Sequence, residues 1–157
     1  MALRGVQRAT VDLDFILMLQ DLDKADAIFR RAGYERVFKS ENVSHYFSRD
    51  LGLGRIDLLH AFRGPTLGML DRCDRIVVAD GVDLPVVQIE DIIGLTIQDA
   101  VNDPKRHDRD WADIQQVLES ASESHQSIDW ELLSDYLALF NLSNQLGKMK
   151  GWYGTLK

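Results

Sequence analysis

Hydrophobic residues follow two different periods along the chain, and the change comes at Pro85. Before that proline, short apolar runs bounded by polar turns show the period of two that is typical of β-strands. These runs cover residues 11–19, 34–39, 43–49, 55–62 and 75–78. Residues 21–32 have apolar positions at helical spacing and are followed by Gly33, so they predict a helix. Residues 65–72 fit one or two further helical turns.

After Pro85 the apolar stripes have the helical period, and they predict amphipathic helices at 89–103, 106–121 and 129–141. The expected fold class is therefore α+β, with a small mixed or antiparallel sheet packed with helices and a helical C-terminal half. No repeat or linker divides the 157 residues. We expect one domain over residues 1–157, with a sheet-rich core at about 1–88 and a helical part at about 89–157.

Both faces of residues 15–19 are apolar, which predicts a central strand buried on both sides. The helices 89–103 and 106–121 should then pack against the sheet that contains this strand. A strand in that position would carry its first residues into the core, and those residues include Asp12 and Asp14.

Charge and composition narrow the possible partners. The net charge of −7 argues against indiscriminate binding to nucleic acid, but residues 1–40 carry +1 and residues 41–157 carry −8. A polyanionic ligand should therefore meet the N-terminal third. Cys73 is the only cysteine, so neither an intrachain disulfide nor a cysteine-based zinc site is expected. No run reaches the ~20 apolar residues of a membrane span, and the N-terminus has no apolar signal core. We expect a cytoplasmic protein without a membrane partner.

The two aspartates at the start of the first strand are the strongest candidates for chemistry. Because alternate residues of a strand share a face, Arg8, Thr10, Asp12 and Asp14 should line one side. Two carboxylates about 7 Å apart repel each other by roughly 1–4 kcal/mol, depending on the effective dielectric. A divalent cation such as Mg²⁺ would convert that repulsion into coordination. The alternative is that both aspartates lie on a solvent-exposed face, paired with Arg8 and a neighbouring residue.

A third carboxylate lies in another apolar strand, in the sequence Arg-Ile-Asp-Leu-Leu at 55–59. If that strand pairs with the first, Asp57 completes a cluster of three with Asp12 and Asp14. Three acids on adjacent strands can hold two metal ions ~3.5–4 Å apart for phosphoryl or nucleotidyl transfer. A metal-dependent phosphoesterase could use the same acids.

The segment Arg-x-Thr-x-Asp-Leu-Asp at 8–14, followed by apolar residues, resembles the metal-binding strand of the nucleotidyltransferase-fold superfamily. Within that superfamily, the segment is similar to AbiEii-type toxins and related bacterial nucleotidyltransferase-like proteins. The third acid at 57 fits the same pattern. So do Val-Gln-Ile-Glu-Asp-Ile-Ile at 87–93 and Arg-Asp-Trp-Ala-Asp-Ile at 109–114. The resemblance extends over about residues 4–120.

This resemblance implies a metal-dependent nucleotidyltransferase that moves a nucleoside monophosphate from an NTP to an RNA or protein acceptor, using Mg²⁺ or Mn²⁺. It also allows a role as the toxin of a pair with an antitoxin partner. The implied catalytic and metal-binding residues are Asp12, Asp14 and Asp57. The implied nucleotide-binding residues are Arg8, Thr10, Thr96, Asp110 and Asp113. The last two could instead form surface ion pairs with Arg106 and Arg109, four residues before each.

Two departures from the family pattern weigh on activity. The family carries a Gly-Gly or Gly-Ser pair about ten residues before the aspartates, where backbone amides hold the triphosphate. In this chain Gly5 is the only glycine before Asp12. Either the start of the chain is misassigned or truncated, or the phosphate cradle is lost. Thr96 stands where the family often has a lysine that would contact phosphate. The alternative function is therefore a catalytically degenerate nucleotidyltransferase-fold protein that acts through a partner protein or by binding nucleotide.

Overall fold

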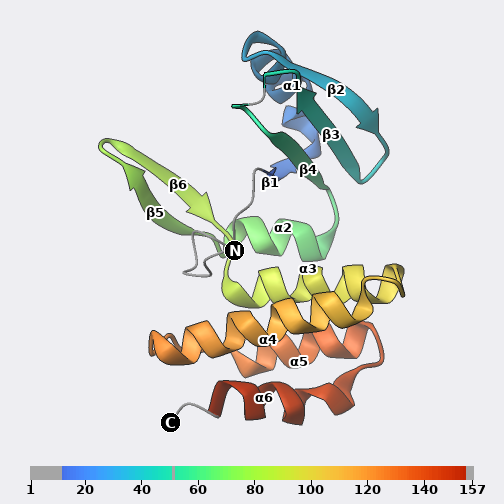
Figure 1. Cartoon of the computed structure of the whole chain (residues 1–157), viewed down its shortest axis with the longest axis vertical. Coiled ribbons are helices and arrows are strands. Elements are labelled where there is room, and N and C mark those ends of the chain that lie inside the picture. The colour runs from blue at the N-terminus through green and yellow to red at the C-terminus, as the bar shows by residue number, and fades with distance from the viewer. Residues whose placement is uncertain (1–11, 51, 155–157) are drawn as a thin grey trace. The chain divides into compact units, whose positions relative to one another are not determined.

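A computed structural model describes residues 12–50 and 52–154, and it has the α+β architecture expected from the sequence (Figure 1). Contacts divide the described chain into two compact units. We call residues 12–72 the sheet unit and residues 73–154 the helical unit. The expectation that both form a single domain over residues 1–157 stays a prediction.

The sheet unit holds a four-stranded sheet with two helices. Its elements are β1 (Asp12–Met18), a 3₁₀ helix (Leu19–Asp21), α1 (Leu22–Arg31), β2 (Tyr34–Lys39), β3 (Val43–Ser48), β4 (Arg55–Ala61) and α2 (Gly64–Asp71). The strand order is β1-β4-β3-β2. β1 runs parallel to β4, and the other neighbours are antiparallel. The three strands predicted between residues 34 and 62 are thereby confirmed.

The expected central position of the first strand is wrong for the described sheet. β1 pairs only with β4 and forms an edge of the sheet, and most of its residues are exposed. Leu13 and Phe15 are 52% and 39% exposed although both point to the face covered by a helix. An apolar run on both faces indicates burial only when two layers cover it. Here α1 packs on one face alone, over Tyr46, Ile56 and neighbouring residues.

Helix α1 is fixed to the sheet by an aromatic contact and a charged cluster. The ring of Phe29 lies 5.1 Å from that of Tyr46, centroid to centroid. Asp26 accepts hydrogen bonds from Arg30 at 2.7 Å and from the Tyr46 hydroxyl at 3.0 Å, and it pairs with Arg36 of β2 at 3.2 Å. The hydrogen bond from Arg30 is the main reason that the pKa of the Asp26 carboxyl lies below its usual value. These contacts hold α1 on the face of the sheet that carries Tyr46.

The helical unit begins with a β-hairpin and continues with four helices. Its elements are β5 (Asp74–Ala79), β6 (Val82–Val86), α3 (Ile89–Asn102), α4 (His107–Glu123), α5 (Trp130–Leu139), a 3₁₀ helix (Ser143–Gln145) and α6 (Leu146–Gly154). The three predicted helices are confirmed, whereas β6 and α6 were not predicted. Among the described residues, no helix combines the length and apolar character needed to cross a membrane.

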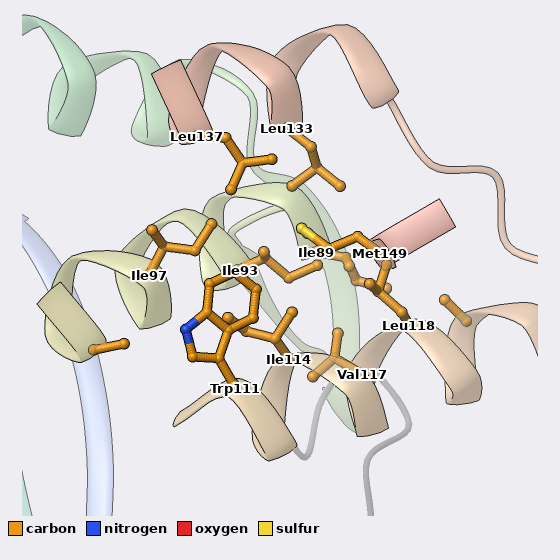
Figure 2. Close-up of a cluster of buried hydrophobic side chains, with 12 residues drawn as sticks. Ile89, Ile93, Ile97, Trp111, Ile114, Val117, Leu118, Leu133, Leu137 and Met149 are labelled. Atoms are coloured by element: carbon orange, nitrogen blue, oxygen red, sulfur yellow. The ribbon is translucent and has the colours of Figure 1, made fainter. Parts of the chain in front are cut away.

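The core of the helical unit lies between α3, α4, α5 and α6 (Figure 2). Ile93, Ile97, Ile114 and Leu137 are fully buried in it. Helices α3 and α5 approach closely at Gly94, where a Cβ would lie 2.7 Å from ring atoms of Tyr136. The predicted packing of residues 89–103 and 106–121 against the sheet stays a prediction.

Two acidic residues of the segment 87–93 have structural partners in this core. Asp91 is fully buried and accepts a hydrogen bond from the Tyr136 hydroxyl at 2.7 Å. Glu90 accepts one at 2.7 Å from the backbone N–H of Asp129, the residue that caps the N-terminus of α5. Both acids therefore join α3 to α5, which accounts for their presence on a largely apolar helix.

Candidate functional site

The face of the sheet opposite α1 carries the acids predicted from the sequence. Asp14 stands opposite Asp57 on the adjacent parallel strand, and Asp12 stands opposite Arg55. Residues paired in this way point to the same side, as do residues two apart in one strand. The three aspartates thus share one face of the described sheet, whereas their assembly into one metal site stays a prediction.

The pairing extends into a row across all four strands. Asp57 is the partner of His45 on β3, and His45 is the partner of Phe38 on β2. The row therefore reads Asp14, Asp57, His45, Phe38, and its ends are three strand spacings apart. A second row, two residues away along β4, consists of Asp12, Arg55, Phe47 and Glu35. We call these eight residues the polar face.

Asp57 is at the centre of a hydrogen-bond network. Its Oδ1 lies 2.6 Å from Nδ1 of His45 and accepts a hydrogen bond from Nε of Arg55 at 2.8 Å. Because a carboxylate can only accept, Nδ1 carries the proton in the neutral ring and Nε2 is left as the acceptor nitrogen. The ring of His45 also stacks on Phe38, with centroids 5.2 Å apart and planes 24° apart. Asp57 thereby fixes the orientation of His45.

Asp14 lies in an environment that disfavours its charged form. Desolvation by the surrounding protein raises the pKa of its carboxyl above the ordinary value of 3.8, although part of the side chain is exposed. The charges of Asp57 and Asp12 raise this pKa further, and Arg55 opposes them. At neutral pH the folded protein therefore carries a carboxylate that it disfavours.

Replacing Asp14 with asparagine should raise the melting temperature at pH 7 in the absence of divalent cations. A raised folded-state pKa favours folding below the unfolded-state pKa, and this contribution is lost as pH rises through the folded value. The gain from Asp14→Asn should therefore shrink as the pH falls towards and below 3.8. Thermal melts across this pH range would measure it. Asp135→Asn, at an exposed position of α5, removes the same charge and should show no such trend. A lower melting temperature of Asp14→Asn at pH 7 would contradict the assignment.

The polar face carries side chains that could coordinate a metal ion, but they are not arranged as a complete metal site. Within residues 12–50 and 52–154, no group of three or more His, Cys, Asp or Glu side chains is positioned to hold a metal ion. Asp57 shares one carboxylate oxygen with Arg55 and His45. Asp12 and Asp14 are exposed residues.

The other predicted nucleotide-binding residues fall into two groups. Arg8 and Thr10 lie outside the residues that the structure describes. Thr96, Asp110 and Asp113 belong to the helical unit. The Thr96 hydroxyl donates to the carbonyl of Ile92 in its own helix at 2.8 Å. Their role towards a nucleotide stays a prediction.

Asp110 is more buried than a residue of a surface ion-pair ladder would be. It is 1% exposed and accepts a hydrogen bond from Arg106 at 3.2 Å, while its Oδ2 is buried without a hydrogen-bond partner among the described atoms. Arg106 also lies 3.7 Å from Asp99, so it links the end of α3 to the start of α4. Asp113 is only partly buried. The pairing of Arg106 with Asp110 thus occurs as the spacing suggested, but with Asp110 inside the unit.

Sequence reasoning missed four members of the polar face, namely His45, Arg55, Phe38 and Phe47. The alternation in Val-Ser-His-Tyr-Phe-Ser at 43–48 places His45 and Phe47 on one side of their strand. That signal could have been used once β3 and β4 were assumed to pair. Spacing along the chain alone does not detect the partner of this histidine, because Asp57 lies twelve residues away on the next strand.

Comparison of the chain with protein-family models and with curated proteins gives no match in either case.

Proposed function

We propose that the polar face binds a divalent cation, Mg²⁺ or Mn²⁺, and that the protein is a metal-dependent nucleotidyltransferase. The reaction would move a nucleoside monophosphate from an NTP to an RNA or protein acceptor. The observation that carries this proposal is the register of β1 and β4, in which Asp14 faces Asp57 and Asp12 lies on the same side. Carboxylate oxygens are the ligands that hard divalent cations prefer.

The electrostatics of Asp14 support a cation in particular. Its raised pKa reflects desolvation together with the repulsion of Asp57 and Asp12. Asp12 and Asp14 would hold the ion, with the second carboxylate oxygen of Asp57 as a further ligand. When bound, the metal would neutralise this charge and hold phosphate oxygens of the substrate. Arg55 would remain beside the site as a fixed cation.

We assign His45 as the proton acceptor in this proposed reaction. Its Nδ1 proton is engaged by Asp57, so Nε2 is the nitrogen that can take a proton from an acceptor hydroxyl. Asp57 would act as a positioning residue for this histidine as well as a metal ligand. This dual use of one carboxylate distinguishes the site from a cluster of acids alone.

Millimolar Mg²⁺ or Mn²⁺ is expected to raise the melting temperature of the protein. A cation at ten times its dissociation constant stabilises the native state by about 1.4 kcal/mol. Asp14→Asn should abolish the metal-dependent rise, whereas Asp135→Asn should retain it. Differential scanning calorimetry of each variant with and without the ion would measure this. No rise with either ion would leave a solvated acidic face and refute the metal site.

The second candidate is a degenerate copy of the fold that binds a partner protein or nucleotide without catalysis. It is favoured by the engagement of Asp57 with Arg55 and His45, which neutralises one acid without a metal. A transfer assay separates the candidates. Incubation of labelled NTP and Mn²⁺ with RNA or with the protein itself should label one of them if the protein is an enzyme. Metal binding without such labelling would favour the degenerate copy.

A further inference from the structure

The polar face carries two exposed aromatic side chains next to its charged residues. Phe38 is 49% exposed and Phe47 is 50% exposed. They lie on the neighbouring strands β2 and β3, one row apart, because Phe38 pairs with His45 and Phe47 lies two residues beyond His45. Diagonal neighbours of this kind are about 7–8 Å apart, within mutual reach of aromatic rings. The two exposed rings thus lie on the same face of the sheet as His45 and Arg55.

We propose that Phe38 and Phe47 form the stacking surface for the base of the nucleotide, and so extend the site beyond its metal-binding acids. The inference rests on the proposed function, since it identifies the part of the same substrate that the acids do not touch. The chemical class of the ligand is a nucleoside 5′-phosphate. Stacking on aromatic side chains is tolerant of base identity because every base has a π-face.

The first row runs from acids to an aromatic ring, in the order that a metal-bound phosphate, a sugar and a base would need. Asp14 lies on β1, Asp57 on β4, His45 on β3 and Phe38 on β2. The second row runs from Asp12 through Arg55 and Phe47 to Glu35, an acid on β2. With neighbouring strands about 4.8 Å apart, the distance from Asp14 to Phe38 is about 14 Å. A metal-bound phosphate, a ribose and a base fit along such a distance. The hydrogen-bond donors of Arg55 and the acceptor Nε2 of His45 would then face the polar sugar and phosphate.

The aromatic area has the size of a base rather than of a protein interface. Two half-exposed phenylalanines offer roughly 200 Å², against about 800 Å² on each partner of a stable protein complex. Stacking of a flat heterocycle on this surface already occurs within the chain, since the imidazole of His45 lies against Phe38 at 24° between planes. These features favour a small planar ligand that carries its own metal-bound phosphate.

The test compares AMP with ribose 5-phosphate, which has the same sugar and phosphate but no base. Both are titrated in the presence of Mg²⁺ and followed by saturation-transfer NMR, which also reports which ligand protons contact the protein. AMP should bind about tenfold more tightly than ribose 5-phosphate, and the signals of its base protons should be the strongest. Phe38→Ala and Phe47→Ala should each remove most of this difference and leave the affinity for ribose 5-phosphate unchanged. Phe47→Trp should retain it.

Ile28→Ala is the matched control, because Ile28 is 60% exposed in α1 of the same unit. It should leave both affinities unchanged. Equal affinity for AMP and ribose 5-phosphate would overturn the stacking surface while the metal and phosphate site stands. Binding of AMP that needs the phenylalanines but neither Mg²⁺ nor Asp14 would support the stacking surface and overturn the proposed reaction. Absence of binding by both ligands would overturn both.

Discussion

Replacing Gly94 with alanine is expected to destabilise the helical unit by about 1–3 kcal/mol, although alanine is the better helix former. The added Cβ would lie 2.7–2.8 Å from three ring atoms of Tyr136, a distance that real Cβ atoms essentially never show. The ring cannot yield easily, because Tyr136 is buried and its hydroxyl is bonded to Asp91. Relief of the clash would separate α3 from α5 and weaken this buried hydrogen bond. Chemical denaturation would measure the change.

The matched control is Gly151→Ala in α6, where an added Cβ meets nothing within 4 Å. That substitution should stabilise the protein by up to about 1 kcal/mol through helix propensity. In a Tyr136→Ala background, Gly94→Ala should cost much less, since the two residues are in contact and their effects should couple. Equal costs of Gly94→Ala in both backgrounds would show that the ring is not the cause.

Leu137→Ala is expected to cost about 2–5 kcal/mol of unfolding free energy. Leu137 is fully buried in the cluster formed by α3, α4, α5 and α6 (Figure 2). Truncation to alanine removes apolar atoms from the interior and leaves a cavity lined by residues of several helices. Because packed interiors relax only partly around a lost side chain, transfer and cavity costs add.

Leu139→Ala tests the same chemical change two residues further along the helix. Leu139 is 63% exposed, so its truncation should change the unfolding free energy by less than about 0.5 kcal/mol. A small effect at Leu137 as well would mean that the core described here does not carry the stability of the helical unit. A large effect at Leu139 would indicate that this exposed leucine is covered in solution.

Most secondary structure could be predicted because the local patterns are strong. Residues 34–39 were predicted as a strand and are one, and the predicted strands 43–49 and 55–62 end one residue earlier in the structure. The helix that begins at Ile89 ends at Asn102, before Pro104, as the proline suggested. In these segments the period of the hydrophobic residues and the positions of the turn residues predict the same element, and tertiary contacts do not override that local preference for strand or helix.

The elements that were missed depend on context that a local pattern lacks. β6 contains Pro85, which argues against a strand, although the preceding Asp80 and Gly81 are a common pair in the turn of a hairpin. α6 contains three glycines, and it packs through Met149, which is fully buried. For the first strand, sequence alone gave two apolar faces but not the number of layers that cover them.

The candidate site could be predicted only in part for a similar reason. Asp12 and Asp14 share a face because of strand periodicity, a local property. The position of Asp57 beside Asp14 depends on the parallel register of β1 and β4, which the sequence suggested only through the hypothesis of a three-acid cluster. The pairing of His45 with Asp57 is a consequence of strand order, and no spacing in the sequence encodes it directly.

The edge position of β1 gives its aspartates a consequence that is independent of catalysis. An edge strand offers unpaired backbone groups to strands of other molecules, and charged side chains on it oppose such pairing. In β1 the charges of Asp12 and Asp14 directly precede the partly exposed run Phe-Ile-Leu-Met-Leu at 15–19. Removing one of these charges can therefore stabilise the fold and, at the same time, make self-association of the protein easier. The same charges that cost free energy within one molecule thus oppose association between molecules.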